Sequence, residues 1–340
     1  MAAQDDAARI AAIYDDFGRR WAHGTSPLYE DWALGIAGDT DVVERLADLP
    51  RAKQQPNLVF ASMRWEGCPL LPYIDIRAWL IEHWAGVVST GATWSVQTNE
   101  ANRCATWLPP LSRIEGPIAL LEVGAAAGLC LFPDRYSVDY RTPAGVRRVH
   151  PPAGPSDVLL ACTVDSETSV PARWPDVVWR RGIDLEPIDA ADDGAIDWLA
   201  NLVWPGPDHD ARVARLRAAA AIAAADPPEI VRGDLLERVT DVAALAPAEA
   251  TLVVFHSAVL LYLDAGQRRR FAELMAGLEA EIGRRVVWLS NETMGTLPEI
   301  DAQVPAGTAT DHRFVQTWNE RAIALAGQHG AVYETAPFAE

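Results

Sequence analysis

The residues with the clearest chemical meaning lie where a short apolar run, Ile118–Val123, stops at a turn of small residues. The turn has the pattern Glu122-x-Gly124-x-Ala126-x-Gly128. Its first glycine frees the backbone for a conformation that other residues avoid, and its last glycine lets a ligand or a following helix approach closely. A helix that begins beyond the turn would offer unpaired N–H groups and its positive dipole end to an anionic group. The spacing differs from the G-x-G-x-x-G of nicotinamide dinucleotide sites.

Polar side chains also end the later apolar runs, at Asp184, Asp234, His256 and Glu292. Ligands in open α/β sheets bind outside the carboxyl ends of the strands, so we expect these side chains to share one edge of a sheet. His256 and Glu292 are candidates for taking a proton from a substrate hydroxyl or amine. The alternative for each is a hydrogen-bonded structural residue.

A third candidate, Arg103, lies with Asn99 and Glu100 just upstream of the first apolar run, in a segment that we predict to be helical. Glu100 and Arg103 are three residues apart, so the simplest interpretation is an ion pair on one helix face. The functional alternative is that Arg103 binds a substrate carboxylate, which matches its planar fork of donors. No grouping of His, Asp and Glu has a spacing typical of metal ligands, and we expect no metal.

The acid two residues before the first glycine, with small residues at alternate positions after it, resembles motif I of class I S-adenosylmethionine-dependent methyltransferases. Ala126 stands where that motif has its middle glycine. The resemblance implies that Glu122, Gly124, Ala126 and Gly128 hold the methionine end of S-adenosyl-L-methionine.

The same resemblance continues in chain order and implies that Asp184 accepts hydrogen bonds from the ribose hydroxyls, and that Asp234 reaches the adenine. The distance from Gly128 to Asp184 is far more than the ~20 residues expected of such a unit. A β-hairpin insertion near residues 137–175 would account for the difference. Asp139 has the better spacing but lies in an alternating, hairpin-like sequence, so we prefer Asp184 and keep Asp139 as the alternative.

The chain also resembles, nearly end to end, a bacterial family known only as a domain of unknown function, which implies no activity. The matching segments are Thr98-Asn-Glu-x-x-Arg-Cys104, Leu121-Glu-Val-Gly-Ala-Ala-Ala-Gly-Leu129, Asp134-Arg-Tyr136, Gly182-Ile-Asp-Leu-x-Pro-Ile-Asp189 and Leu202-Val-Trp-Pro205. Cys130 departs from the asparagine expected there.

The elements around these residues follow from the spacing of apolar residues. Residues 1–95 carry apolar residues at three- and four-residue spacing and predict a tryptophan-rich helical cap. Residues 96–340 alternate apolar runs with helical stretches, which predicts a mostly parallel sheet. Two further runs, 313–318 and 331–334, would form an antiparallel pair at its C-terminal end. The fold class is therefore α/β, with a Rossmann-like sheet of the class I methyltransferase type and an N-terminal helical region.

Composition limits the partners. The 340 residues carry a formal charge of −18, which makes nucleic acid an unlikely partner. No apolar run approaches the ~20 residues that span a membrane, and the acidic N-terminus leads us to expect no signal peptide. The four cysteines are widely separated, as in a reduced cytoplasmic protein. The sequence leaves open whether the chain forms a homo-oligomer.

We therefore predict a cytoplasmic S-adenosylmethionine-dependent methyltransferase that acts on a small molecule by direct displacement, with Arg103, His256 and Glu292 as candidate catalytic residues and the helical cap over the substrate. Such an enzyme mainly positions the nucleophile and excludes water. The atom that would receive the methyl group stays open. The alternatives are an inactive methyltransferase-like module with a binding or regulatory role, and a nicotinamide-dependent oxidoreductase.

Overall fold

The computed structural model describes residues 2–310 and 313–338 and divides the chain into two compact units. The helical unit runs to Thr98 and also includes Gly194–Ala214. The sheet unit comprises Asn99–Asp193 and the chain from Arg215 onward. Each unit is described below by itself.

The helical unit is built from short helices, and local signals explain where several of them begin. Ser26 caps α2 by accepting a hydrogen bond from Tyr29 N, and Pro27 takes the first helical position, where no N–H is needed. Asp39 caps α3 in the same way, through Val42 N. The helices are α1 (Ala2–Asp16), α2 (Pro27–Ala37), α3 (Thr40–Ala47), α4 (Pro56–Trp65), α5 (Tyr73–Glu82), α6 (Trp84–Thr93), α8 (Asp193–Asn201) and the first part of α9 (His209–Ala225).

Aromatic side chains fill the core of the helical unit. Trp32 is fully buried, donates its indole N–H to the Leu71 carbonyl at 2.8 Å, and packs edge-on against Phe60. Trp21 and Trp65, in contrast, are about 40% exposed, so the tryptophans of this region are not all core residues. No described helix is long and apolar enough to cross a membrane.

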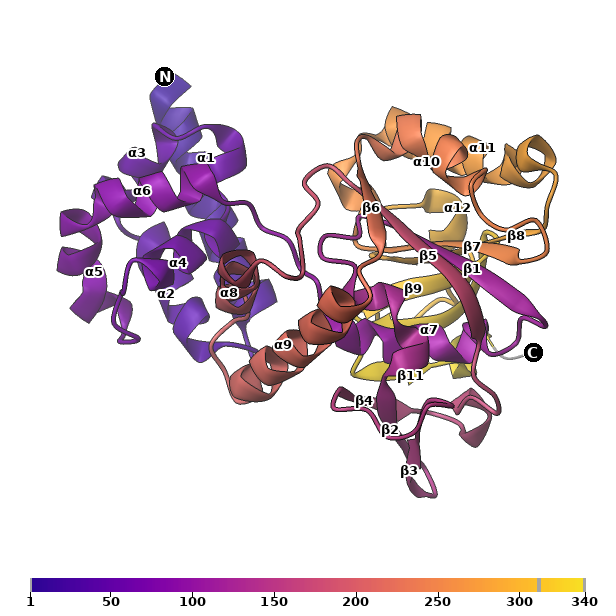
Figure 1. Ribbon diagram of the computed structural model, residues 1–340. Helices are drawn as coiled ribbons and strands as arrows, with labels where there is room; N and C mark the ends of the chain where they lie inside the picture. The colour runs from indigo at the N-terminus through magenta and orange to yellow at the C-terminus, as the bar shows by residue number, and fades with distance from the viewer. Residues whose placement is uncertain (1, 311–312, 339–340) are drawn as a thin grey trace. The chain divides into compact units, whose positions relative to one another are not determined.

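The sheet unit contains a mixed sheet with 11 strands in its described part, in the order β3-β2-β4-β11-β10-β9-β8-β7-β1-β5-β6 (Figure 1). The strands are β1 (Pro117–Val123), β2 (Ser137–Thr142), β3 (Gly145–Val149), β4 (Leu159–Val164), β5 (Asp176–Asp184), β6 (Glu229–Arg232), β7 (Thr251–Ser257), β8 (Val286–Glu292), β9 (Arg313–Trp318), β10 (Arg321–Gly327) and β11 (Val332–Glu334).

Five neighbouring strands, β6-β5-β1-β7-β8, are all parallel. Numbered in chain order among themselves, they run 3-2-1-4-5 across the sheet. The chain therefore builds outward from β1 on one side, through β5 and β6, and then returns to the other side of β1 for β7. The carboxyl ends of β1 and β7 flank the point at which the connections change direction.

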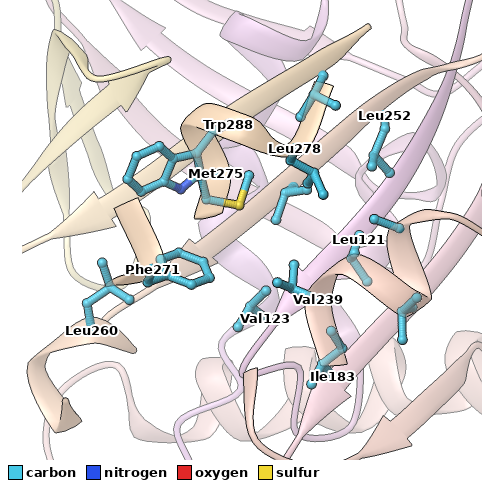
Figure 2. Packing of buried hydrophobic residues seen from close by; sticks show 14 of the residues in the cluster. Leu121, Val123, Ile183, Val239, Leu252, Leu260, Phe271, Met275, Leu278 and Trp288 are labelled. Carbon is cyan, nitrogen blue, oxygen red and sulfur yellow. The ribbon is translucent and has the colours of Figure 1, made fainter. Parts of the chain in front are cut away.

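Helices cover both faces of this parallel region. α10 (Leu235–Ala243) and α11 (Ala265–Ile282) lie on one face, where their apolar residues meet those of β1, β7 and β8 (Figures 1 and 2). Phe271 and Trp288 pack edge to face at the centre of this layer, with ring centroids 5.8 Å apart. α7 (Cys104–Leu111) lies on the opposite face, where Trp107 packs against Phe255 of β7. β1, β7 and β8 are thus buried on both faces, which explains their continuous apolar runs, whereas β5 and β6 are only partly buried.

The predicted hairpin is present as β2 and β3, and β4 extends it by pairing parallel with β2. We call these three strands the edge ribbon (residues 137–164). The predicted C-terminal pairing, however, is wrong in its partners. β9 pairs with β10, a strand that the sequence pattern did not indicate, and β11 joins β10 on one side to β4 on the other.

Two helix predictions also need correction. No α-helix begins directly after Gly128, because residues 129–135 form two short 3-10 turns, in which residues 129–133 are buried. The segment around Arg103 is a 3-10 turn, Ala101–Arg103, that leads into α7. α7 was not predicted at all, since it contains Pro109 and Pro110, which usually interrupt helices.

Candidate functional site

The glycine turn after β1 has the backbone conformation that its residue types suggest. Gly124 and Gly128 have φ values of +73° and +70°, and Ala126, at +49°, also adopts a left-handed conformation. Protein groups pack closely around the turn. The side chain of Val259 lies against Gly124, and Pro228 lies against Gly128.

The end of β5 holds the turn in place. One oxygen of Asp184 accepts a hydrogen bond from Ala126 N, and the other accepts one from Glu186 N, both at 2.8 Å. The N–H of Gly233, at the end of β6, donates to the Asp184 carbonyl. Asp234, the next residue, caps α10 by accepting from Leu236 N at 2.7 Å. The two predicted acids therefore lie at the ends of neighbouring strands, and each already has a structural role.

Glu122 lies at the end of β1 with 5% of its surface exposed, and its Oε2 has no hydrogen-bond partner among the described residues. Burial raises the pKa of Glu122 well above its usual range; the neighbouring Cys130 raises it further, and Arg103 opposes the shift. An acid in this environment holds its proton at a pH where an ordinary glutamate has lost it.

This pKa shift predicts a pH-dependent effect of Glu122→Gln on stability. The unfolded chain ionises Glu122 near pH ~4.3, whereas the folded chain keeps the proton to higher pH. Between those two pKa values the folded state binds more protons, so the stability that Glu122 contributes falls as the pH rises. The glutamine variant does not titrate and should gain stability relative to the wild type from pH ~4 upward, as measured by urea unfolding. Glu273→Gln, at an exposed position, is the control; a pH-independent difference for Glu122→Gln would contradict the prediction.

His256 and Glu292 lie together on the α11 face of the sheet. Trp288 Nε1 donates to His256 Nε2 at 3.0 Å, and an indole nitrogen can only donate, so the proton of the neutral imidazole is on Nδ1. Nδ1 then donates to Glu292 Oε1 at 2.8 Å. The imidazole is completely buried, and both its nitrogens are engaged.

Glu292 links this pair to the loop after β7. Its Oε1 also accepts hydrogen bonds from Val259 N and Leu260 N, at 2.9 and 3.0 Å. Its Oε2 is buried and has no partner among the described residues. One carboxylate oxygen thus fixes the loop that packs against Gly124, while the other is buried without a hydrogen-bond partner among the described residues.

Polar side chains without a full set of partners gather on the α7 face at the same end of the sheet. Register pairs Ser257 with Asn291 and Asn291 with Gln316, so the three side chains lie side by side on adjacent strands. Ser257 Oγ, Asn291 Nδ2 and Gln316 Oε1 are buried and have no partner among the described residues. Buried polar atoms are nearly always hydrogen-bonded, so such a group indicates a place for water or a ligand.

Arg103 lies beside this group and is 8% exposed. Its Nε donates to the Gln328 carbonyl at 2.9 Å, and its Nη1 is 3.5 Å from the Ser257 carbonyl. The sequence predicted an ion pair between Arg103 and Glu100. In the structure the Glu100 carboxylate pairs with Arg215 instead, at 3.0 Å. Within residues 2–310 and 313–338, Arg103 forms no ion pair.

The structure therefore connects the predicted residues through short links. Asp184 contacts the turn at Ala126, and Glu292 contacts it through the Val259 loop. Asp139, in contrast, pairs with Arg148 within the hairpin, and six strands separate β2 from β1. Sequence reasoning missed Ser257 and Gln316, because only the strand register shows that they are neighbours. No three His, Cys, Asp or Glu side chains of the described ranges gather as metal ligands.

Comparison with known families gives a match over residues 70–334 to the family described as "Uncharacterized protein conserved in bacteria (DUF2332)". The match includes the glycine turn, the five parallel strands and Arg103. No curated protein matches the chain.

Proposed function

Since the chain belongs to this bacterial family, whose description assigns no activity, we propose from the site itself that the sheet unit is a class I S-adenosylmethionine-dependent methyltransferase that acts on a small molecule. One observation carries the proposal. The parallel strands have the 3-2-1-4-5 order of dinucleotide-binding Rossmann folds, and the polar residues lie at their carboxyl ends. Ligands of such sheets bind where the strand order reverses, which here is between β1 and β7.

The residues at the β1, β5 and β6 ends fit the cofactor in chemical type. Glu122, Gly124, Ala126 and Gly128 would hold its methionine end, with the turn fixed by Val259 and Pro228, which pack against the two glycines. Asp184 would bind the ribose, because its carboxylate lies at the carboxyl end of β5, next to the glycine turn, where a carboxylate can accept a hydrogen bond from a hydroxyl. Asp234 would contact the adenine. When bound, S-adenosylmethionine supplies an electrophilic methyl group.

The chain's own residues on the other side of the switch point would position the acceptor. Glu292 Oε2 is the unpartnered carboxylate oxygen there, and it is our candidate for receiving a proton from the acceptor. His256 would act as a positioning residue, since its Nδ1–H holds Glu292 Oε1 and it has no nitrogen left for substrate. That the helical region covers the substrate stays a prediction.

A binding or regulatory module without catalysis is the second candidate, and a specific observation favours it. Asp184 already closes the turn by bonding to Ala126 N, and no α-helix follows the turn to present its N-terminus to a ligand. Both candidates expect S-adenosylmethionine to bind; only the first expects the demethylated product to accumulate with an acceptor.

The test is calorimetric titration of the full chain with S-adenosylmethionine and S-adenosylhomocysteine. We expect one site per sheet unit and competition between the two ligands. Asp234→Asn should weaken binding by about tenfold, because it loses a charge-assisted hydrogen bond of ~1.4 kcal/mol, while asparagine still caps α10. If neither ligand binds to the folded wild type at millimolar concentration, the proposal fails. Binding of NADH instead would favour the nicotinamide-dependent alternative.

A further inference from the structure

Arg103 is a buried cation without a counter-charge. Of its nitrogens, Nε donates to a backbone carbonyl, Nη1 makes only the long contact with Ser257 O, and Nη2 has no partner in the described part of the chain. The guanidinium also lies 5.7 Å from the centroid of the Phe314 ring. Carbonyl dipoles and a ring face offset part of the cost of burying the charge, but buried charges in proteins are normally paired with an opposite charge.

Two acids of the sheet unit could supply that charge, and neither forms an ion pair with Arg103. Glu100 is paired with Arg215. Glu122 keeps its proton more readily than an ordinary glutamate, because burial raises its pKa. The outer end of the Arg103 fork is therefore left for an anion from outside the chain.

The surroundings indicate which anion. The planar fork of Arg103 fits a carboxylate bidentately, and its one positive charge neutralises a carboxylate but not a doubly charged phosphate. Ser257 Oγ, Asn291 Nδ2 and Gln316 Oε1 offer one hydroxyl, one donor and one acceptor beside it.

We propose that Arg103 binds the carboxylate of a small carboxylic acid, and that Ser257, Asn291 and Gln316 bind polar groups of the same molecule. This inference rests on the proposed function in one respect, since the carboxylate belongs either to the methyl acceptor or to the amino-acid end of S-adenosylmethionine. The chemistry at Arg103 is the same in both cases.

The first test measures thermal unfolding of the full chain with acetate and benzoate, each compared at constant ionic strength with its neutral isostere, acetamide or benzamide. A ligand that binds only the folded state raises the midpoint, and a ligand concentration of ten times its Kd corresponds to a rise on the order of 3–6 °C in a unit of this size. We expect this rise with a carboxylate but not with its amide. Arg103→Gln should abolish it, and Arg321→Gln, at an exposed position of the same unit, should leave it unchanged.

Arg103→Lys is the second variant, because it keeps the charge but loses the fork; its carboxylate response should fall to less than half. If the wild type responds equally to acids and amides, or if folded Arg103→Gln responds like the wild type, the inference is wrong. Should both variants fail to fold, the wild-type comparison of acids with amides still decides.

A second measurement distinguishes the two sources of the carboxylate and separates this inference from the proposed function. S-adenosylhomocysteine carries a carboxylate, and 5′-methylthioadenosine does not. If the cofactor supplies the carboxylate, Arg103→Gln should weaken binding of the first by at least tenfold and leave binding of the second unchanged. If the acceptor supplies it, the acids should still raise the midpoint at saturating S-adenosylhomocysteine. An acid response without any nucleoside binding would overturn the proposed function and leave the carboxylate site standing.

Discussion

Gly330→Ala should destabilise the sheet unit by roughly 4 kcal/mol or more. Gly330 lies in the turn between β10 and β11 with φ +73°, a conformation that alanine avoids. A Cβ at this position would overlap the carbonyl of Asn102 and lie 2.7 Å from Arg103 N. These are backbone atoms of the 3-10 turn before α7, so no side-chain rotation can relieve the overlap.

The same turn holds Arg103 and Asn102 through its carbonyls. Gln328 O accepts from Arg103 Nε, and His329 O accepts from Asn102 Nδ2. Gly116→Ala is the matched control, because Gly116 has φ +78° but open space around its Cβ position, and it should cost only about 1–2 kcal/mol. The measurement is the free energy of unfolding in urea. Equal losses in the two variants would show that the close approach of the two segments is not tight.

Gly124→Ala should cost roughly 2–4 kcal/mol, the sum of a left-handed conformation and an overlap with a side chain. A Cβ on Gly124 would lie 2.5 Å from Val259 Cγ2. Unlike the neighbours of Gly330, this is a side-chain atom that a second substitution can remove. The expected cost is therefore divided between conformation and packing.

A double-mutant cycle with Val259→Ala measures that division. We expect Gly124→Ala to be milder in the Val259→Ala background by about 1–2 kcal/mol, because the overlap disappears and only the conformational cost remains. Costs that simply add would mean that Val259 does not pack against the glycine turn, and that the loop held by Glu292 is placed differently.

Much of the parallel region could be predicted from the sequence, because β1, β7 and β8 are buried on both faces and read as short apolar runs. β5 and β6, which are only partly buried, also appear where shorter apolar runs stand. The helix expected after Gly128 is absent, and two buried 3-10 turns take its place. The sequence pattern did not predict α7, because the helix contains two prolines, and it did not predict β10, because most residues of that strand are small.

The site was less predictable, since its residues meet through strand register and not through spacing. Asp184 could be placed at the end of a strand, but its bond to Ala126 N depends on how closely β5 approaches the turn. Gln316 reaches Asn291 and the Thr106 carbonyl from a strand whose order in the sheet the sequence did not reveal. Arg103 was identified as a candidate, yet its lack of an ion pair follows from Glu100 bonding to Arg215, far along the chain.

The edge ribbon has a consequence for biosynthesis. It joins the rest of the sheet through β11, so its partner strand is made long after it; Asp165 and Thr335, which hydrogen-bond at this junction, are 170 residues apart. Translation proceeds at about 5–20 residues per second, so β11 is synthesised on the order of 10–30 s after the ribbon. During that time the N–H and C=O groups on the β4 edge that later pairs with β11 have no partner strand. Exposed strand edges of this kind recruit other chains. The nascent protein is therefore most vulnerable to aggregation while residues 165–331 are being synthesised, and a chaperone that shields the ribbon would act in that interval.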